Sequence, residues 1–262
     1  MKKLLLSSIA VLLLFVAGLA QSGYKKPPKE IQEILDAPSI PAVSISPGRD
    51  KIGLLEPLRY PPISELAEPM LRLAGVRINP KNNAQHRQQY SVSLTLKNIS
   101  DGKEFPVRLP AGTRIAAPRW SLDGRHIAFA NITAGGVELW FVDTASATAK
   151  KIPNLYVNTA FGGFDWIDNQ TLIVQSVPSN RGPAPEYRDV VPNEPNIQET
   201  TGRAGAVQTF QDLLRSPNDE KLFEYFATSQ LVFVETNGKV RKVGSPAIFE
   251  TADVSSDVKY IL

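Results

Sequence analysis

The chain has 262 residues, of which 42% are hydrophobic, so it is long and apolar enough to bury a sizeable core. Its formal net charge is +3, and its basic residues are scattered without interleaved aromatic residues, so nothing indicates a nucleic-acid partner. The sequence contains no cysteine, which excludes disulfides and cysteine-ligated metal sites.

Residues 1–20 are predicted to be a secretory signal peptide. Lys2 and Lys3 precede the apolar residues 4–19, and the small residues Gly18 and Ala20 stand before Gln21. The apolar run is short for a membrane-spanning helix, which needs roughly 20 residues. We therefore expect an exported protein, periplasmic or extracellular, without a membrane anchor after cleavage. Residues 21–42 are predicted to be an amino-terminal extension.

Residues 118–129 carry the clearest structural pattern. Trp120 ends one predicted strand, Asp123-Gly124 supplies the positive-φ positions of a tight turn, and His126 begins the next strand. Similar patterns occur in residues 43–54, 164–174 and 253–262. A hairpin repeated in this way is typical of β-propeller blades.

A second hairpin follows two of these starts. One joins residues 136–143 to 149–152, and the other joins 230–235 to 240–243 through Asn237-Gly238. The sequence therefore predicts a mainly β fold, a partial β-propeller over residues 43–262 with about three four-stranded blades and the start of a fourth. Closed propellers have at least four blades, so we expect this chain to be an incomplete propeller from a longer protein.

Two long insertions interrupt the predicted blades. The first, residues 57–89, is predicted to contain a short helical turn within residues 63–71 that is broken by Pro69. The second, from Pro178 to about Arg215, begins rich in proline, and its residues 209–214 are predicted to be helical. Loops of this length are either functional or solvated excursions, and the sequence leaves both interpretations open.

No constellation of residues in the chain predicts catalysis. There is no Gly-x-Ser-x-Gly elbow and no phosphate-binding loop. We interpret His86 as a loop residue and His126 as a surface residue of a strand, because neither has a partner in a recognisable motif. The pair Asp165 and Asp168 is explained by a strand end and a turn. We therefore predict no catalytic, cofactor-binding or metal-binding residue.

Several segments nevertheless resemble a known family. They include residues 23–31, Leu66-Ala67-Glu68-Pro69, residues 73–80, Pro178-Ser179-Asn180-Arg181-Gly182 and residues 209–214. From about residue 23 to its last residue, the chain resembles the amino-terminal part of the prolyl oligopeptidase family of serine peptidases, in its glutamyl endopeptidase branch. The resemblance implies a secreted endopeptidase that cleaves after glutamate. It also implies a propeller that covers an α/β-hydrolase domain and restricts substrates by size.

The resemblance also implies that this chain is inactive alone. The family's catalytic serine, aspartate and histidine belong to a carboxy-terminal hydrolase domain that is absent here, so peptide substrates would bind through that missing domain. The alternative is a stand-alone propeller-like binding or scaffolding module of the cell envelope without enzymatic activity. Arg181 is a candidate for selecting acidic side chains, although a solvated loop arginine is the favoured interpretation.

Overall fold

The computed structural model describes residues 26–187, 199, 202, 210–255 and 257–261, so the predicted signal peptide lies outside the described residues. The chain forms two units, residues 1–39 and 40–262. The described part of the first contains α2 (Lys29–Asp36), whose Ile31, Ile34 and Leu35 have the spacing of one helix face. No helix among the described residues is long and apolar enough to cross a membrane.

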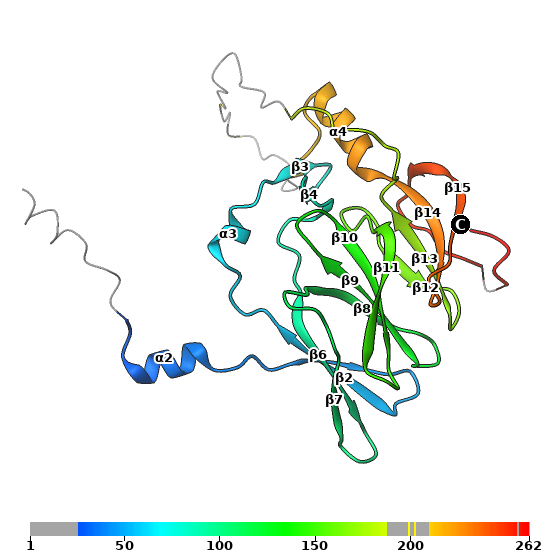
Figure 1. Ribbon diagram of the computed structural model, residues 1–262. Helices are drawn as coiled ribbons and strands as arrows, with labels where there is room; N and C mark the ends of the chain where they lie inside the picture. The colour runs from blue at the N-terminus through cyan, green and yellow to red at the C-terminus, as the bar shows by residue number, and fades with distance from the viewer. Residues whose placement is uncertain (1–25, 188–198, 200–201, 203–209, 256, 262) are drawn as a thin grey trace, which may run out of the picture. The chain divides into compact units, whose positions relative to one another are not determined.

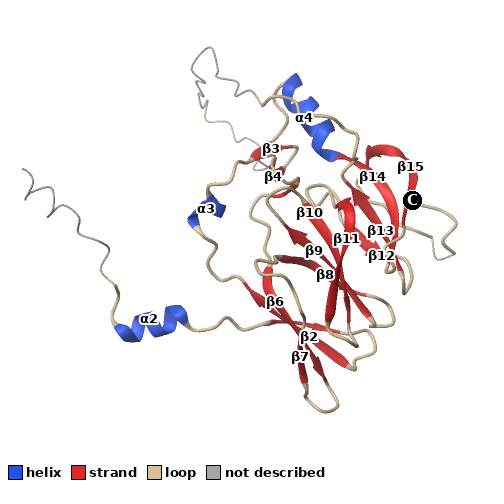
Figure 2. Ribbon diagram, in the orientation of Figure 1, coloured by secondary structure: helices blue, strands red, loops and turns tan. Residues whose placement is uncertain are grey.

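The second unit contains three antiparallel blades of four strands, which confirms the predicted partial propeller (Figures 1 and 2). The first two blades are joined into one sheet by the single pair Ser91 and Ile115. The third blade is a separate four-stranded sheet. Blade 1 consists of β1 (Ala42–Ile45), β2 (Lys51–Pro57), β6 (Ser91–Asn98) and β7 (Glu104–Pro106); blade 2 of β8 (Ile115–Trp120), β9 (His126–Ile132), β10 (Val137–Asp143) and β11 (Thr148–Tyr156); blade 3 of β12 (Phe164–Trp166), β13 (Thr171–Ser176), β14 (Thr228–Glu235) and β15 (Val240–Ile248).

The turn that opens blade 2 is held by a serine. Ser121 Oγ donates to Asp123 Oδ1 at 2.7 Å and accepts the His126 backbone N–H at 3.0 Å. Gly124 has φ 71°, as predicted for this turn. The side chain of Ser121 is fully buried, so its hydroxyl forms these bonds at the inner side of the turn.

The same serine turn recurs in other blades. Ser46 Oγ donates to Asp50 and accepts the backbone N–H of residue 51, and Ser255 Oγ donates to Asp257 and accepts the N–H of residue 260. An isolated bridge pairs Val254 with Ile261, which is the start of a fourth blade. Blade 3 differs, because Asp168 Oδ1 accepts the N–H groups of residues 170 and 171 instead.

Replacing Ser121 by alanine should therefore cost about 1–2 kcal/mol of unfolding free energy, since the His126 N–H loses its acceptor and the Asp123 carboxylate loses one of its two donors. Urea denaturation followed by circular dichroism would measure the loss. Ser255→Ala removes the same two bonds at an exposed turn, where we expect less than about 0.5 kcal/mol. Equal losses at the two sites would show that burial of the serine is unimportant.

Strand β9 explains how the blades stack. Its successive side chains point to opposite faces, and both faces are buried. Ile127 and Phe129 join the core between blades 1 and 2, whereas Ala128 and Ala130 join the core between blades 2 and 3. The small alanines leave room for Trp166 in that second core.

Both insertions connect the second strand of a blade to the third. The first contains α3 (Ile63–Leu66), β3 (Leu71–Leu73), β4 (Val76–Asn79) and β5 (Ala84–Gln85), and the second contains α4 (Pro217–Ala227). The predicted helical turn is α3, which ends before Pro69; the small sheet of β3, β4 and β5 was not predicted. Figure 1 shows β3, β4 and α4 at one end of the blades.

The insertions pack on each other instead of extending separately into solvent. Leu73 and Ile78 of the first share a core with Leu222 and Phe226 of the second. Asp212 adds polar links, since Arg77 Nε lies 3.0 Å from its Oδ2 and its backbone oxygen accepts the N–H of residue 75. We call the described residues of both insertions, 58–90, 177–187 and 210–227, the insertion lobe.

The helix predicted at residues 209–214 is wrong over its described residues. Asp212 has φ 55°, a left-handed conformation that a right-handed helix cannot contain. The helix begins later, where Ser216 accepts the N–H of Asp219 as the N-cap and Pro217 occupies the first turn. This Ser-Pro-Asn-Asp sequence was the signal that could have placed α4.

Candidate functional site

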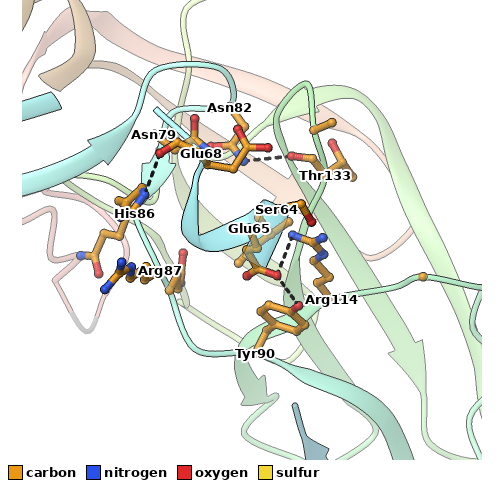
Figure 3. Close-up of a pocket in the computed structure, with 15 residues that line it drawn as sticks. Ser64, Glu65, Glu68, Asn79, Asn82, His86, Arg87, Tyr90, Arg114 and Thr133 are labelled. Carbon is orange, nitrogen blue, oxygen red and sulfur yellow. Dashed lines mark hydrogen bonds and ion pairs between the residues drawn. The ribbon is translucent and has the colours of Figure 1, made fainter. Parts of the chain in front are cut away.

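A polar cavity of about 350 Å³ lies between the first insertion and blade 2 (Figure 3). Its walls come from α3, from the segment around β5, from Tyr90, from the loop before β8 and from the β9–β10 turn. Side-chain amides, carboxylates and cations make up most of this lining. The cavity therefore suits a polar ligand better than an apolar one.

Glu65 is the central acidic group of the cavity. Tyr90 donates its hydroxyl to Glu65 Oε2 at 2.8 Å, and Arg114 Nη1 lies 3.7 Å from the same oxygen. The Arg114 guanidinium also lies 5.1 Å from the centre of the Tyr90 ring. Figure 3 shows the three side chains converging from α3, from the segment before β6 and from the start of blade 2. This cluster fixes α3 to the blades.

Glu68 and His86 form a second polar group in the cavity. Lys81 Nζ lies 2.9 Å from Glu68 Oε2, and this bond lowers the pKa of the Glu68 carboxyl. His86 Nε2 lies 3.1 Å from the Glu68 backbone oxygen, which can only accept, so this ring nitrogen is the donor. Asn82 Nδ2 donates to the Thr133 backbone oxygen at 3.0 Å and ties the insertion to blade 2.

Burial, followed by the hydrogen bond to Glu65, raises the pKa of Tyr90 to about 12, against 10.0 for the unperturbed group. Because the folded state holds the Tyr90 proton more tightly, this contribution to stability is complete below pH 10 and is lost as the pH rises to about 12. We expect Tyr90→Phe to reduce the loss of stability between pH 10 and 12. Denaturation of both proteins across that range would measure it; parallel curves would contradict it.

Each of the two carboxylates of the cavity is paired with a cation, and the described residues form no connected series of catalytic groups. Arg114 faces Glu65 and Lys81 faces Glu68, which leaves Arg87 and amides such as Gln85 to contact a ligand. A nucleophile with a base and an orienting acid is not assembled in the described part of the cavity. The amides can donate hydrogen bonds to a polar ligand and accept them from it.

The sequence-predicted polar residues lie apart from each other. His86 lines the cavity, as a residue in the loop after β5. The interpretation of His126 as a surface residue is wrong, because the structure half-buries its side chain. Its Nδ1 is buried, and the centre of its ring lies 6.4 Å from that of Trp166. Asp168 accepts turn N–H groups. Glu65, Tyr90 and Arg114 had no local motif to identify them, because they meet only through the fold.

Arg181 is not the solvated loop residue that the sequence favoured. Its Nη1 donates to Asn83 Oδ1 at 2.7 Å and to the Tyr225 backbone oxygen at 3.2 Å. Its guanidinium lies 4.2 Å from the centre of the Tyr225 ring, and burial lowers its pKa. Asn83 also donates to Asn158 Oδ1 at 2.7 Å, so Arg181 belongs to a half-buried network that links both insertions to blade 3.

Two curated plant proteins match most of this chain. A protein of Oryza sativa subsp. japonica named "Probable glutamyl endopeptidase, chloroplastic" is 41% identical over 258 residues, which cover 93% of this chain and 27% of that protein. A protein of Arabidopsis thaliana with the same name is 39% identical, covering 92% and 26%. The predicted resemblance is confirmed, and the chain spans about a quarter of the length of these relatives.

Solved structures overlap the chain more weakly, and no protein-family model matches it. One from a study of two prolyl endopeptidases has a TM-score of 0.46 at 12% identity, covering 86% of this chain and 25% of that one. TolB from Acinetobacter baumannii has a TM-score of 0.37 at 15% identity, covering 86% and 37%. Overlaps this low do not bear on function.

The expectation of a periplasmic or extracellular protein is wrong. Both matched relatives are named chloroplastic, which points to a plastid. The sequence features that suggested export do not separate the two destinations well. A basic start without acidic residues is shared by secretory signals and plastid transit peptides.

Proposed function

Because this chain is related to the glutamyl endopeptidases through its propeller part, we propose that it is the non-catalytic propeller portion of a serine endopeptidase that cleaves after glutamate. The observation that carries the proposal is the 41% identity over 93% of the chain. Each insertion is longer than the unmatched remainder of the chain, so the match includes at least part of each insertion.

The role proposed for this portion is to restrict the access of substrates. The insertion lobe supports it, because two long connections that pack at one end of the blades form a fixed structure there. A fixed lobe at the rim of a propeller can admit an extended peptide while excluding a folded protein.

The first blade also leaves Val43 and Ile45 exposed, an apolar surface that further blades would cover.

The test begins with the longest product of the reading frame that contains this chain. That product should cleave a peptide after glutamate and leave the matched glutamine peptide intact, whereas the 262-residue chain alone should cleave neither. A reading frame that stops directly after Leu262, or a longer product without glutamyl cleavage, would overturn the proposal. The first of these outcomes would favour a stand-alone binding module.

The gating role has a separate readout in that longer product. Asp212→Ala removes the carboxylate that faces Arg72 and Arg77 and should loosen the lobe. We expect a greater gain in cleavage of a folded glutamate-rich protein than of a short peptide. An equal change for both substrates would contradict gating while leaving the assignment as a peptidase intact.

A further inference from the structure

A second cavity, of about 440 Å³, lies where the end of β11 meets the start of the second insertion and the strands β14 and β15. Of the described residues that line it, two carry a charge, Arg181 and Lys242, and both are positive. Tyr156, Val177 and Val240 contribute apolar walls. The cavity is therefore cationic at one side and apolar at another, and we call it the Arg181 cavity.

Among the described residues, the groups that hold Arg181 in place are uncharged. Its hydrogen bonds to described residues both use Nη1, and both acceptors, Asn83 Oδ1 and the Tyr225 backbone oxygen, are uncharged. A guanidinium has five N–H donors, so three remain beyond those on Nη1. Stacking on Tyr225 fixes the plane in which these donors lie. A half-buried cation that lacks a carboxylate partner among the described residues favours an incoming anion.

Gln230 supplies an oriented acceptor in the same cavity. Its side chain is only 6% exposed, and its Nε2 donates to the backbone oxygens of residues 231, 243 and 244 at 3.0, 2.9 and 3.2 Å. With the nitrogen turned toward these carbonyls, Oε1 is turned away from them. Gln230 stands at the irregularity between β14 and β15, which sets this orientation.

We infer that the Arg181 cavity binds an acidic side chain of a peptide. The free N–H groups of Arg181 would hold the carboxylate in a planar, two-bond geometry, and Gln230 Oε1 would accept a backbone N–H of the same peptide. The apolar walls suit the methylene groups of the acidic side chain, and the positive charge of Lys242 adds electrostatic attraction for its carboxylate. This inference takes the peptide ligand from the proposed function and assigns recognition of its acidic residue to this chain.

The test measures binding, so it does not depend on peptidase activity. The 262-residue chain, labelled with ¹⁵N, is titrated with acetyl-Ala-Glu-Ala-amide and with the matched glutamine peptide. We expect the glutamate peptide to shift amide signals around residues 177–182 and 230–242 and to bind at least tenfold more tightly. Added salt should weaken this binding because the attraction is ionic. Equal binding of the two peptides, or shifts confined to other regions, would overturn the inference.

Variants identify the groups responsible. Arg181→Gln should weaken binding of the glutamate peptide at least tenfold, and Lys242→Gln two- to threefold. If Arg181→Gln does not fold, Val240→Glu tests the same point, because Val240 lies on the exposed edge strand and lines the cavity. Its carboxylate should compete with the peptide, whereas Val240→Gln should bind nearly as the unmodified chain does. Unchanged affinity in Val240→Glu would overturn the inference.

Inorganic phosphate is the competing anion. In the same titration we expect phosphate to displace the glutamate peptide only at much higher concentration, because one guanidinium and one exposed ammonium suit a single carboxylate charge. Binding of phosphate without binding of the glutamate peptide would overturn the assignment to an acidic peptide.

Discussion

Replacing Phe226 by alanine is expected to lower the free energy of unfolding by about 3–5 kcal/mol, the range for a large aromatic side chain removed from a core. Phe226 is only 1% exposed and packs with residues of both insertions. Its ring meets that of Tyr225 edge to face with centroids 5.0 Å apart. Because polar networks anchor the insertion lobe, the lobe has little freedom to collapse into the cavity that the substitution would leave.

Urea denaturation followed by tryptophan fluorescence and circular dichroism would measure this effect. The matched control is Phe210→Ala, which removes the same side chain at a position that is 72% exposed and should change stability by less than about 0.5 kcal/mol. If Phe226→Ala were as mild as the control, the insertion lobe would not be a packed part of the folded unit. Full loss of lobe structure with intact blades would show that the two unfold separately.

The blades could be predicted from the sequence because their determinants are local. Asp123-Gly124 and Asn237-Gly238 form turns whose geometry depends on a few neighbouring residues. In β9, successive side chains point alternately to the two faces of the blade, which follows from the two-residue period of a strand. The double hydrogen bond of the serine that closes three of the turns became clear only in the structure.

The insertion lobe could not be predicted in the same way, because its contacts join residues far apart in the chain. Asp212 meets Arg77 across 135 positions, and Arg181 meets Asn83 across 98. Neither pair belongs to a motif, and the strands β3, β4 and β5 are too short to give a periodic signal. Arg181 was therefore interpreted as solvated, since burial of a loop residue is decided by tertiary packing.

The buried amide network gives the second large effect. Asn158 is fully buried; its Nδ2 donates to the Phe226 backbone oxygen at 2.8 Å and to Ser229 Oγ at 2.9 Å, and its Oδ1 accepts from Asn83. Asn158→Ala should cost about 2–4 kcal/mol, because several buried polar groups lose their partner at once. The same urea measurement applies.

A double-mutant cycle shows whether this loss reflects a connected network. Asn83→Ala alone removes the acceptor of Arg181 as well as the donor to Asn158. Because the two amides bond each other, we expect the double variant to be less destabilised than the sum of the singles, with a coupling of about 1–2 kcal/mol. Additive losses would mean that each asparagine acts alone. A measured coupling would instead establish that the first insertion, blade 3 and α4 stabilise one another, which is the rigidity that a substrate-restricting lobe requires.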